Sequence, residues 1–295
     1  MTDRSDIKKI DALPYRCSLN IKAIYRTLKT AEKRAIDYII SNPEKIKDIS
    51  IDGLAAEAGC SKSTIVRISK RLGYSGFSSL KSDFAKSMKN PKEDFMEYEG
   101  ISRTDSPFKV MEKVFDSSIR SVKDTLRIID KGEFLKALEA ILEADKILFC
   151  GIGDAYLVAL EAYQRFTRLG VDCNAESDPD IQLLKSSQLK KGDIFFAISY
   201  SGRSIPVIDC LKVAKRTQAT SIALTNYPVS PIAKKSDILL QTAVFTKYPT
   251  GEVMSKRLTE LLVIESLYTN YIIRKTKEIK KEIETSHRIL DINKA

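Results

Sequence analysis

Apolar residues in the first third of the chain recur at the spacing of α-helices. Ala35, Ile36, Ile39 and Ile40 share one helix face, and Asn42-Pro43 ends that helix. The pattern therefore predicts an all-α region. Three further helices are expected: one from Ser50 to Gly59, one from Ser61 to Gly73, and one that carries Phe77, Leu80, Phe84 and Met88.

From Phe108 onwards the pattern changes to short apolar runs that alternate with helices. Such runs, without polar alternation, are typical of a sheet that is buried on both faces. The alternation of strands and helices predicts a parallel sheet with right-handed crossovers. The expected strands are residues 146–150, 171–174, 194–199, 221–225 and 238–241, and the expected helices are 108–130, 133–143, 155–169, 179–189, 205–216, 230–235 and 253–281.

Two stretches without a clean period give the domain boundaries. Residues 90–107 contain Pro91, Gly100 and Pro107 together with several acidic residues, which is typical of a linker. The first residues of the chain also lack a pattern. The predicted organisation is an arm (1–18), an all-α domain (19–89), the linker (90–107), a three-layer α/β domain (108–281) and a C-terminal tail (282–295).

The composition excludes several classes of protein. Hydrophobic residues make up 43% of the chain and charged residues 30%, which fits a globular protein and not a disordered one. No apolar run is long enough for a membrane span, and the polar N-terminus lacks a secretory signal. The five cysteines form no CxxC pair, so we expect reduced thiols in a cytoplasmic protein. A single histidine, His287, argues against histidine-based metal sites and catalytic triads.

Positive charge is concentrated in the N-terminal third. Residues 1–90 carry a net charge of +8, residues 91–270 carry −1, and residues 271–295 carry +3. A basic segment beside a near-neutral one suggests a module that binds a polyanion. Solvated lysines on helix surfaces would explain the charge equally well, so charge alone does not distinguish a polyanion-binding module from an ordinary helical surface.

Residues 51–71 contain a motif that favours the polyanion-binding module. Leu54, Ala55 and Ala58 make one apolar face, Gly59 turns the chain, and Ser61 caps the following helix. Two short helices joined by a glycine turn are typical of a helix-turn-helix, whose second helix enters the DNA major groove. An ordinary helical hairpin is the alternative. The residues expected to face double-stranded DNA are Lys62, Ser63, Thr64, Arg67, Lys70 and Arg71.

Hydroxyl residues and glycines lie where the predicted parallel strands end. Ser199, Ser201, Gly202 and Ser204 separate a strand from a helix N-terminus, a position that favours a bound phosphate. Simple capping of turns is the alternative reading for each loop. The further residues expected at this crevice are Gly151, Gly153, Asp154, Glu176, Asn226 and Glu252, of which the acids would accept hydrogen bonds from sugar hydroxyls.

Together the motifs resemble the RpiR-type bacterial transcription regulators, which join a helix-turn-helix to a SIS (sugar isomerase) domain with a parallel, flavodoxin-like sheet. The resemblance covers nearly the whole chain after about residue 20. It implies that Ser199, Ser201 and Ser204 bind phosphate. Such regulators often carry a small residue and a serine where this chain has Asp154 and Ala155, so the crevice here has one hydroxyl fewer and one charge more. The matching segments are AEKRAIDYII (31–40), LGYSGF (72–77), GIG (151–153), SYSGRS (199–204), ALTN (223–226) and SPIAKKSD (230–237).

The resemblance implies a DNA-binding regulator of carbohydrate metabolism that senses a phosphorylated sugar. No cofactor, metal, catalytic residue or membrane partner is expected. A helix-turn-helix covers one half-site, so we expect a homo-oligomer, a dimer or a tetramer. Two alternatives remain: an aldose–ketose sugar-phosphate isomerase, and an interaction module that binds no ligand.

Overall fold

The computed structural model describes residues 10, 13–87, 101–102, 104–244 and 255–292. The chain divides into two compact units. Residues 1–128 together with 243–254 form the first, and residues 129–242 together with 255–295 form the second. This division places helix α8 (Pro107–Ile128) in the first unit, whereas the sequence pattern assigned it to the second domain.

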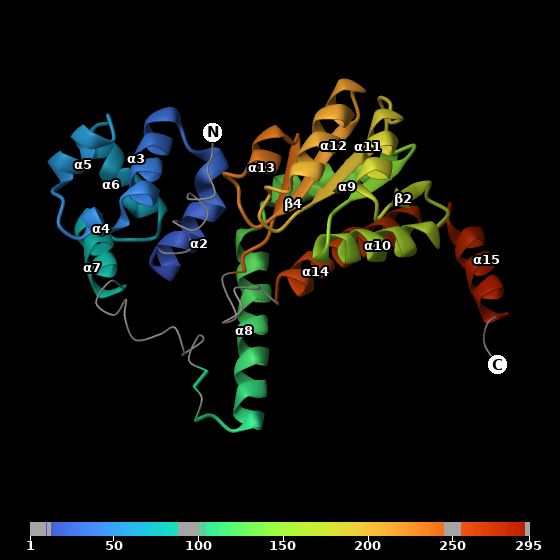
Figure 1. Cartoon of the computed structure of the whole chain (residues 1–295), viewed down its shortest axis with the longest axis horizontal. Helices are drawn as coiled ribbons and strands as arrows, with labels where there is room; N and C mark the ends of the chain where they lie inside the picture. Colours follow the sequence, from blue (N-terminus) through green and yellow to red (C-terminus); the bar gives the residue numbers. More distant parts are fainter. Residues whose placement is uncertain (1–9, 11–12, 88–100, 103, 245–254, 293–295) are drawn as a thin grey trace. The chain divides into compact units, whose positions relative to one another are not determined.

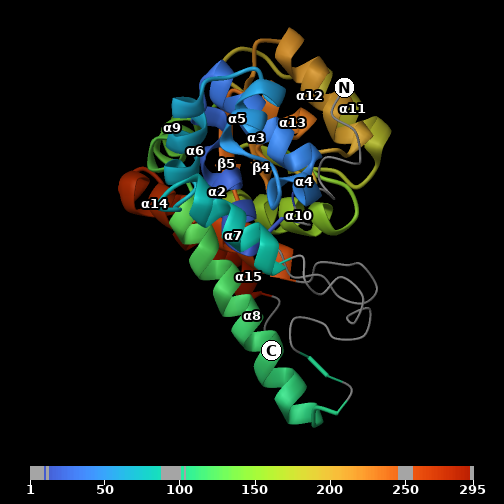
Figure 2. The same ribbon diagram turned by 90° about the vertical axis from the view of Figure 1, so that its left-hand side faces the viewer.

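The first unit is helical, as predicted. Its core gathers the apolar faces of short helices, with Ile36, Leu54, Ile68 and Phe84 almost completely buried. Helix α8 is one uninterrupted helix in both views (Figures 1 and 2). The elements are α2 (Tyr15–Ile24), η1 (Tyr25–Thr27), α3 (Thr30–Ser41), α4 (Pro43–Ile46), α5 (Ile51–Glu57), α6 (Lys62–Arg71), α7 (Phe77–Ser87) and α8.

The expected N-terminal arm is packed where the structure describes it. Ile10 and Cys17 are fully buried, and the Ser18 hydroxyl donates a hydrogen bond of 2.9 Å to the Ile10 carbonyl oxygen. Helix α2 begins at Tyr15, inside the stretch predicted to be an arm. The prediction was wrong here because a short apolar segment can pack without showing a helical period of its own.

The second unit is a parallel sheet with helices on both faces. Strand order β2-β1-β3-β4-β5 confirms the flavodoxin-like arrangement, and every described pairing is parallel. The strands are β1 (Ile147–Cys150), β2 (Cys173–Ala175), β3 (Ile194–Ile198), β4 (Thr220–Thr225) and β5 (Ile238–Gln241). The helices are α9 (Lys131–Glu143), α10 (Asp154–Thr167), α11 (Pro179–Ser187), α12 (Ile205–Arg216), α13 (Pro231–Lys235), α14 (Ser255–Lys275) and α15 (Lys280–Asp291).

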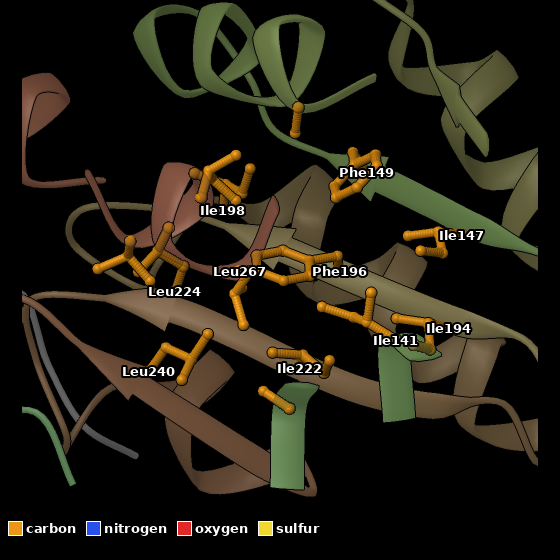
Figure 3. Packing of buried hydrophobic residues seen from close by; sticks show 14 of the residues in the cluster. Ile141, Ile147, Phe149, Ile194, Phe196, Ile198, Ile222, Leu224, Leu240 and Leu267 are labelled. Carbon is orange, nitrogen blue, oxygen red and sulfur yellow. The ribbon is translucent and has the colours of Figure 1, made fainter. Parts of the chain in front are cut away.

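Alternate residues of each strand enter two separate cores. Phe149, Phe196 and Ile222 pack with α9, α10 and α14, whereas Leu148 and Phe195 pack with α12, α13 and Leu189, which follows α11. Figure 1 shows these two helical layers on opposite sides of the sheet. In Figure 3, Leu267 of α14 lies among the side chains of the first core. Burial on both faces explains why the strands read as unbroken apolar runs.

The C-terminal end of the chain differs from the prediction. The expected helix 253–281 ends at Lys275, and a second helix, α15, occupies most of the expected tail. The Thr276 hydroxyl donates to the carbonyl oxygens of Ile272 and Ile273, which marks the break. The Ser286 hydroxyl donates to the Arg168 carbonyl oxygen at 2.8 Å, so α15 is fixed to the unit. Among the described residues, no helix is long and apolar enough to cross a membrane.

Candidate functional site

Helices α5 and α6 form the predicted helix-turn-helix geometry. Ser50 caps α5 by accepting a hydrogen bond from the Gly53 amide at 3.0 Å, and Ser61 caps α6 by accepting from the Thr64 amide at 3.2 Å. Gly59 turns the chain between them with a φ of +59°, a left-handed conformation that disfavours side chains. The capping serines and the glycine turn therefore lie where the sequence predicted them.

The outward face of α6 is basic. Lys62, Ser63, Arg67 and Lys70 are exposed and Arg71 is half-exposed. An open depression on this face is lined by Ser63, Val66, Arg67, Lys70 and Arg71. Val66 is a residue of this face that the sequence reasoning missed, although it lies three residues after Ser63 and four before Lys70, and this spacing places all three on one side of the helix.

Thr64 does not face outward, which corrects the predicted set. Its residue is only 5% exposed, and its hydroxyl lies 2.9 Å from the Ser61 hydroxyl. Thr64, Ile65 and Ile68 occupy neighbouring positions on the inner face of α6. Thr64 is the third residue of the helix, where a side chain can turn back to the capping serine. Its role is therefore to hold the start of α6.

Arg67 and Arg71 share one buried acid that the sequence reasoning did not identify. Arg67 Nε donates to Glu32 Oε1 at 2.8 Å, and Arg71 Nη1 donates to Glu32 Oε2 at 2.9 Å. The Glu32 side chain is 3% exposed, whereas that of Arg67 is 54% exposed. Arg71 also donates to the Thr27 hydroxyl at 2.7 Å. Helix α3 therefore orients two arginines of α6.

The electrostatic balance keeps Glu32 charged. Burial alone would raise the pKa of Glu32, but hydrogen bonds from the Lys29 amide and Arg67, and the charge of Arg71, outweigh it and lower the pKa. Glu32, Arg67 and Arg71 together carry a net charge of +1 on the outward face of α6. Arg67, with its guanidinium half in solvent and oriented by Glu32, is the better placed of the two arginines for a phosphate or a base edge.

A second candidate site is a cavity of about 250 Å³ in the α/β unit. Its walls come from the carboxyl ends of β1 and β3, the start of α10 and the start of α14. The carboxyl ends of parallel strands are the usual ligand site of an open α/β sheet. The lining residues are Ile152, Asp154, Ala155, Ile198, Ser199, Tyr200, Ser201, Ser204, Lys256 and Glu260.

Three serines of the cavity lining have hydroxyl groups that are available to bind a ligand. Within the described part of the chain, the hydroxyls of Ser199, Ser201 and Ser204 have no hydrogen-bond partner. Ser204 is the N-cap residue of α12, yet its side chain makes no capping bond. The first amides of α12 also lack partners within the helix, and the helix dipole is positive there. This loop can therefore bind an anion with hydroxyl and amide donors.

Backbone contacts hold the serine loop in place. Gly202 has a φ of +61°, and a Cβ atom there would overlap the Ser230 side chain. The Gly202 carbonyl oxygen accepts a hydrogen bond of 3.1 Å from the Ile232 amide. The Tyr200 carbonyl oxygen accepts from the Thr225 hydroxyl and from the Asn226 amide. The loop is thus fixed before any ligand arrives.

Two glycines shape the loop between β1 and α10. Gly153 is the N-cap residue of α10 with a φ of +61°. A Cβ atom on Gly151 would lie 2.6 Å from the Ala155 carbonyl oxygen, so only glycine fits there. Gly151 and Gly153 therefore bring Asp154 and Ala155 to the wall of the cavity through backbone geometry.

Several predicted ligand residues do not line the cavity. Gly151, Gly153 and Gly202 act through the backbone as described, and Asn226 is fully buried behind the serine loop. The side chain of Glu176 is absent from the lining, and its main-chain carbonyl oxygen accepts from Gln182 Nε2 at 2.6 Å. Glu252 lies outside the described residues.

Helix α14 contributes two charged residues that the sequence reasoning missed. Lys256 Nζ lies 2.8 Å from Asp154 Oδ2 and 5.9 Å from the centre of the Tyr200 ring. The hydrogen bond from Lys256, more than its charge, lowers the pKa of Asp154. Lys256 and Glu260 are four residues apart, so they share one helix face. That spacing was the only signal in the sequence, and it did not show which face meets the cavity.

Glu260 is a buried acid that makes no ion pair within the described residues. It is 1% exposed, and its Oε1 atom has no hydrogen-bond partner there. Burial raises the pKa of Glu260 to about 8, although the charge of Lys256 acts in the opposite direction. A buried acid in a cavity is a residue that a ligand group can engage.

Comparisons with known proteins identify both domains. The chain matches the helix-turn-helix domain of the rpiR family at residues 16–91 and the SIS domain at residues 140–270. An HTH-type transcriptional regulator of Caldanaerobacter subterraneus subsp. tengcongensis is 30% identical over 274 residues, covering 93% of this chain and 96% of the relative. HexR, an HTH-type transcriptional regulator of Pseudomonas aeruginosa, is 27% identical over 84% of this chain and 86% of its own.

A solved structure supports the same fold. The Vibrio vulnificus NanR protein complexed with ManNAc-6P superimposes with a TM-score of 0.61 at 21% identity, covering 94% of this chain and 99% of that chain. These two sequence relatives match 93% and 84% of this chain, and both are named HTH-type transcriptional regulators. This chain therefore belongs to the RpiR family of helix-turn-helix transcriptional regulators that carry a SIS domain.

Proposed function

We propose that this regulator binds its DNA operator through α6 and a phosphorylated sugar in the cavity lined by Ser199, Ser201 and Ser204. The observation that carries the proposal is the set of three serine hydroxyls beside the N-terminus of α12, which have no hydrogen-bond partner among the described residues. Hydroxyl and amide donors at a positive helix end suit a phosphate group. The ligand named with the NanR structure, ManNAc-6P, is a sugar phosphate and supports the same ligand class here.

A thermal-shift screen of hexose and pentose phosphates tests the ligand. A compound that binds the folded state raises its unfolding temperature, because binding stabilises that state alone. We expect a shift with at least one sugar phosphate, and none with the corresponding unphosphorylated sugar. Ser201→Ala should reduce the shift, whereas Ser187→Ala, a serine on α11 outside the cavity, should retain it. An unchanged melting temperature with every phosphate would contradict the proposal.

We also propose that the protein acts as a homo-oligomer in the cytoplasm. A single α6 covers one half-site, so specific binding needs two copies. Leu258 and Leu262 on α14 are each 42% exposed, whereas Val263, Ile264 and Leu267 on the same helix are buried. Helix α14 therefore packs on the sheet with one face and leaves an apolar face for a second copy. Light scattering at micromolar concentration should give at least twice the monomer mass.

An isomerase remains the alternative, and Glu260 is the observation that favours it. A buried carboxyl group in a cavity can move protons. The single histidine, His287, is exposed on α15 and is not among the lining residues. An aldose–ketose turnover assay on the full chain separates the two functions: isomerisation that Glu260→Gln abolishes would establish the enzyme, and binding without turnover supports the regulator.

A further inference from the structure

We infer that the sugar phosphate recognised by this cavity carries a free amino group, and that Glu260 selects it. The inference rests on the proposed function, because it names the ligand class of the same cavity. It concerns the two acids, Asp154 and Glu260, that the serine loop does not explain.

Of the two acids that line the cavity, only Asp154 forms an ion pair in the described part of the chain. The charged lining residues of the cavity are Asp154, Lys256 and Glu260. Lys256 is already paired with Asp154 at 2.8 Å. Glu260 makes no ion pair in the described part of the chain, and its Oε1 atom has no hydrogen-bond partner. A buried carboxyl group without partners destabilises a protein, so its presence in a ligand cavity indicates a ligand group that completes it.

A sugar phosphate without an amine offers Glu260 only hydroxyl groups, and hydrogen bonds to neutral groups leave this carboxyl group protonated. An ammonium group on the sugar offers it a cation instead, beside which the carboxyl group ionises. Its hydrogen bond to a carboxylate is charge-assisted and about twice as strong as one between neutral groups. Serine hydroxyls for the phosphate and Glu260 for the amine together describe a zwitterionic ligand.

N-acetylation should abolish this advantage. An acetamido group carries no charge and cannot pair with the Glu260 carboxylate. The expected ligand class is therefore a 2-amino-2-deoxyhexose phosphate with an unsubstituted amine.

Binding of such a ligand should release a proton. In the free protein the pKa of Glu260 is about 8, so the group is largely protonated at pH 7. Lys256 and Arg257 from α14 act on it with positive charge, and Asp154 from α10 with negative charge. An ammonium group beside Glu260 lowers this pKa, and the acid then loses its proton to the buffer. A sugar hydroxyl in the same place has no such effect.

Calorimetry with matched pairs of ligands tests the inference on the full-length protein. Each pair differs only in the group at C2: glucosamine and glucose 6-phosphates, mannosamine and mannose 6-phosphates, and galactosamine and galactose 6-phosphates. The N-acetylated forms complete the set. We expect one amino sugar phosphate to bind at least about tenfold more tightly than its hydroxyl partner, as charge-assisted bonds require. Titrations in two buffers of different ionisation enthalpy then report the proton released.

Two variants test whether Glu260 causes the preference for the amino sugar phosphate. Glu260→Gln keeps the size of the side chain but removes its charge, so it should lower the preference to nearly equal affinities and remove the proton release that is specific to the amine. Glu265→Gln is the matched control, because Glu265 lies on the same helix but pairs with Arg165 at 2.9 Å outside the cavity. This control should keep both the preference and the proton release.

The outcomes separate the two proposals. Equal affinity of the parent protein for amino and hydroxyl partners, or an undiminished preference in Glu260→Gln, overturns the amino-sugar inference and leaves sugar-phosphate sensing intact. Binding of no sugar phosphate at all overturns the proposed function itself. The proton-release measurement uses the parent protein alone, so it decides the inference even if a variant fails to fold.

Discussion

Replacing Glu260 with glutamine should change how the stability of the α/β unit depends on pH. Glutamine has the size of a protonated glutamate but cannot ionise. In the folded protein the pKa of Glu260 is about 8, compared with an ordinary value of 4.5. Between these values the folded state holds a proton that the unfolded state has lost. The parent protein therefore loses stability as pH rises, and Glu260→Gln does not lose it.

The magnitude follows from the linkage between proton binding and folding. Each pH unit in this range changes the free energy of unfolding by about 1.36 kcal/mol. From pH 5.5 to pH 7.5, the stability of Glu260→Gln relative to the parent should therefore rise by about 2.7 kcal/mol. For a domain of this size, such a difference corresponds to about 5–11 °C in melting temperature.

The assay must report the α/β unit by itself, because a chain of two units need not unfold in one step. Urea unfolding followed by pulsed hydrogen exchange, with mass spectrometry of peptides from β3 and β4, meets this need. Glu265→Gln, at a half-exposed position on the same helix, is the control. Its free energy of unfolding should differ from that of the parent by the same amount at every pH in this range. Parallel pH profiles for the parent and Glu260→Gln would refute the buried, protonated state of Glu260.

Other consequences of the structure can be measured directly. Glu32→Gln should destabilise the helical unit by about 1–3 kcal/mol, measured by urea unfolding, since two arginines lose their shared acid. Lys70→Ala should weaken binding to operator and non-operator DNA equally and flatten the salt dependence, whereas Arg67→Ala should also relax base preference in a fluorescence-anisotropy competition. Ser201→Ala should leave operator affinity intact without ligand but abolish its change on adding the sugar phosphate. Gly202→Ala should lower the melting temperature, because its Cβ atom would overlap Ser230.

For regulation, the ligand must bind two arrangements of the protein with different affinity. Coupling of about 1–3 kcal/mol is typical and would change operator affinity by about 5–150-fold. Titration of labelled operator with and without ligand measures this ratio. If a ligand that binds the cavity leaves the operator affinity unchanged, ligand binding is not coupled to DNA binding.

Local pattern alone predicted most of the secondary structure and the positions of both motifs. The inner faces of helices follow a period near 3.6 residues, so Ile65 and Ile68 could be placed in the core from the sequence. Apolar runs without alternation indicated a doubly covered parallel sheet. Because ligands bind at the carboxyl ends of such strands, the sequence alone predicted that Ser199, Ser201 and Ser204 share one crevice, and all three line the cavity.

Contacts between distant segments were decided only by the tertiary structure. Glu32 meets Arg67 and Arg71 across 35 and 39 residues, and no local period reports such a meeting. Thr64 fits either face of α6 by composition, and the hydroxyl contact with Ser61 turns it inward.

The ligand cavity shows the same division. Its serines follow a strand directly, so their sequence neighbourhood predicts their place. Lys256 and Glu260 lie on α14, far in sequence from the serine loop, and only the packing of α14 on the sheet brings them to the cavity. Sequence thus determined which elements form, whereas the burial of one helix face against the sheet decided which charges meet the ligand.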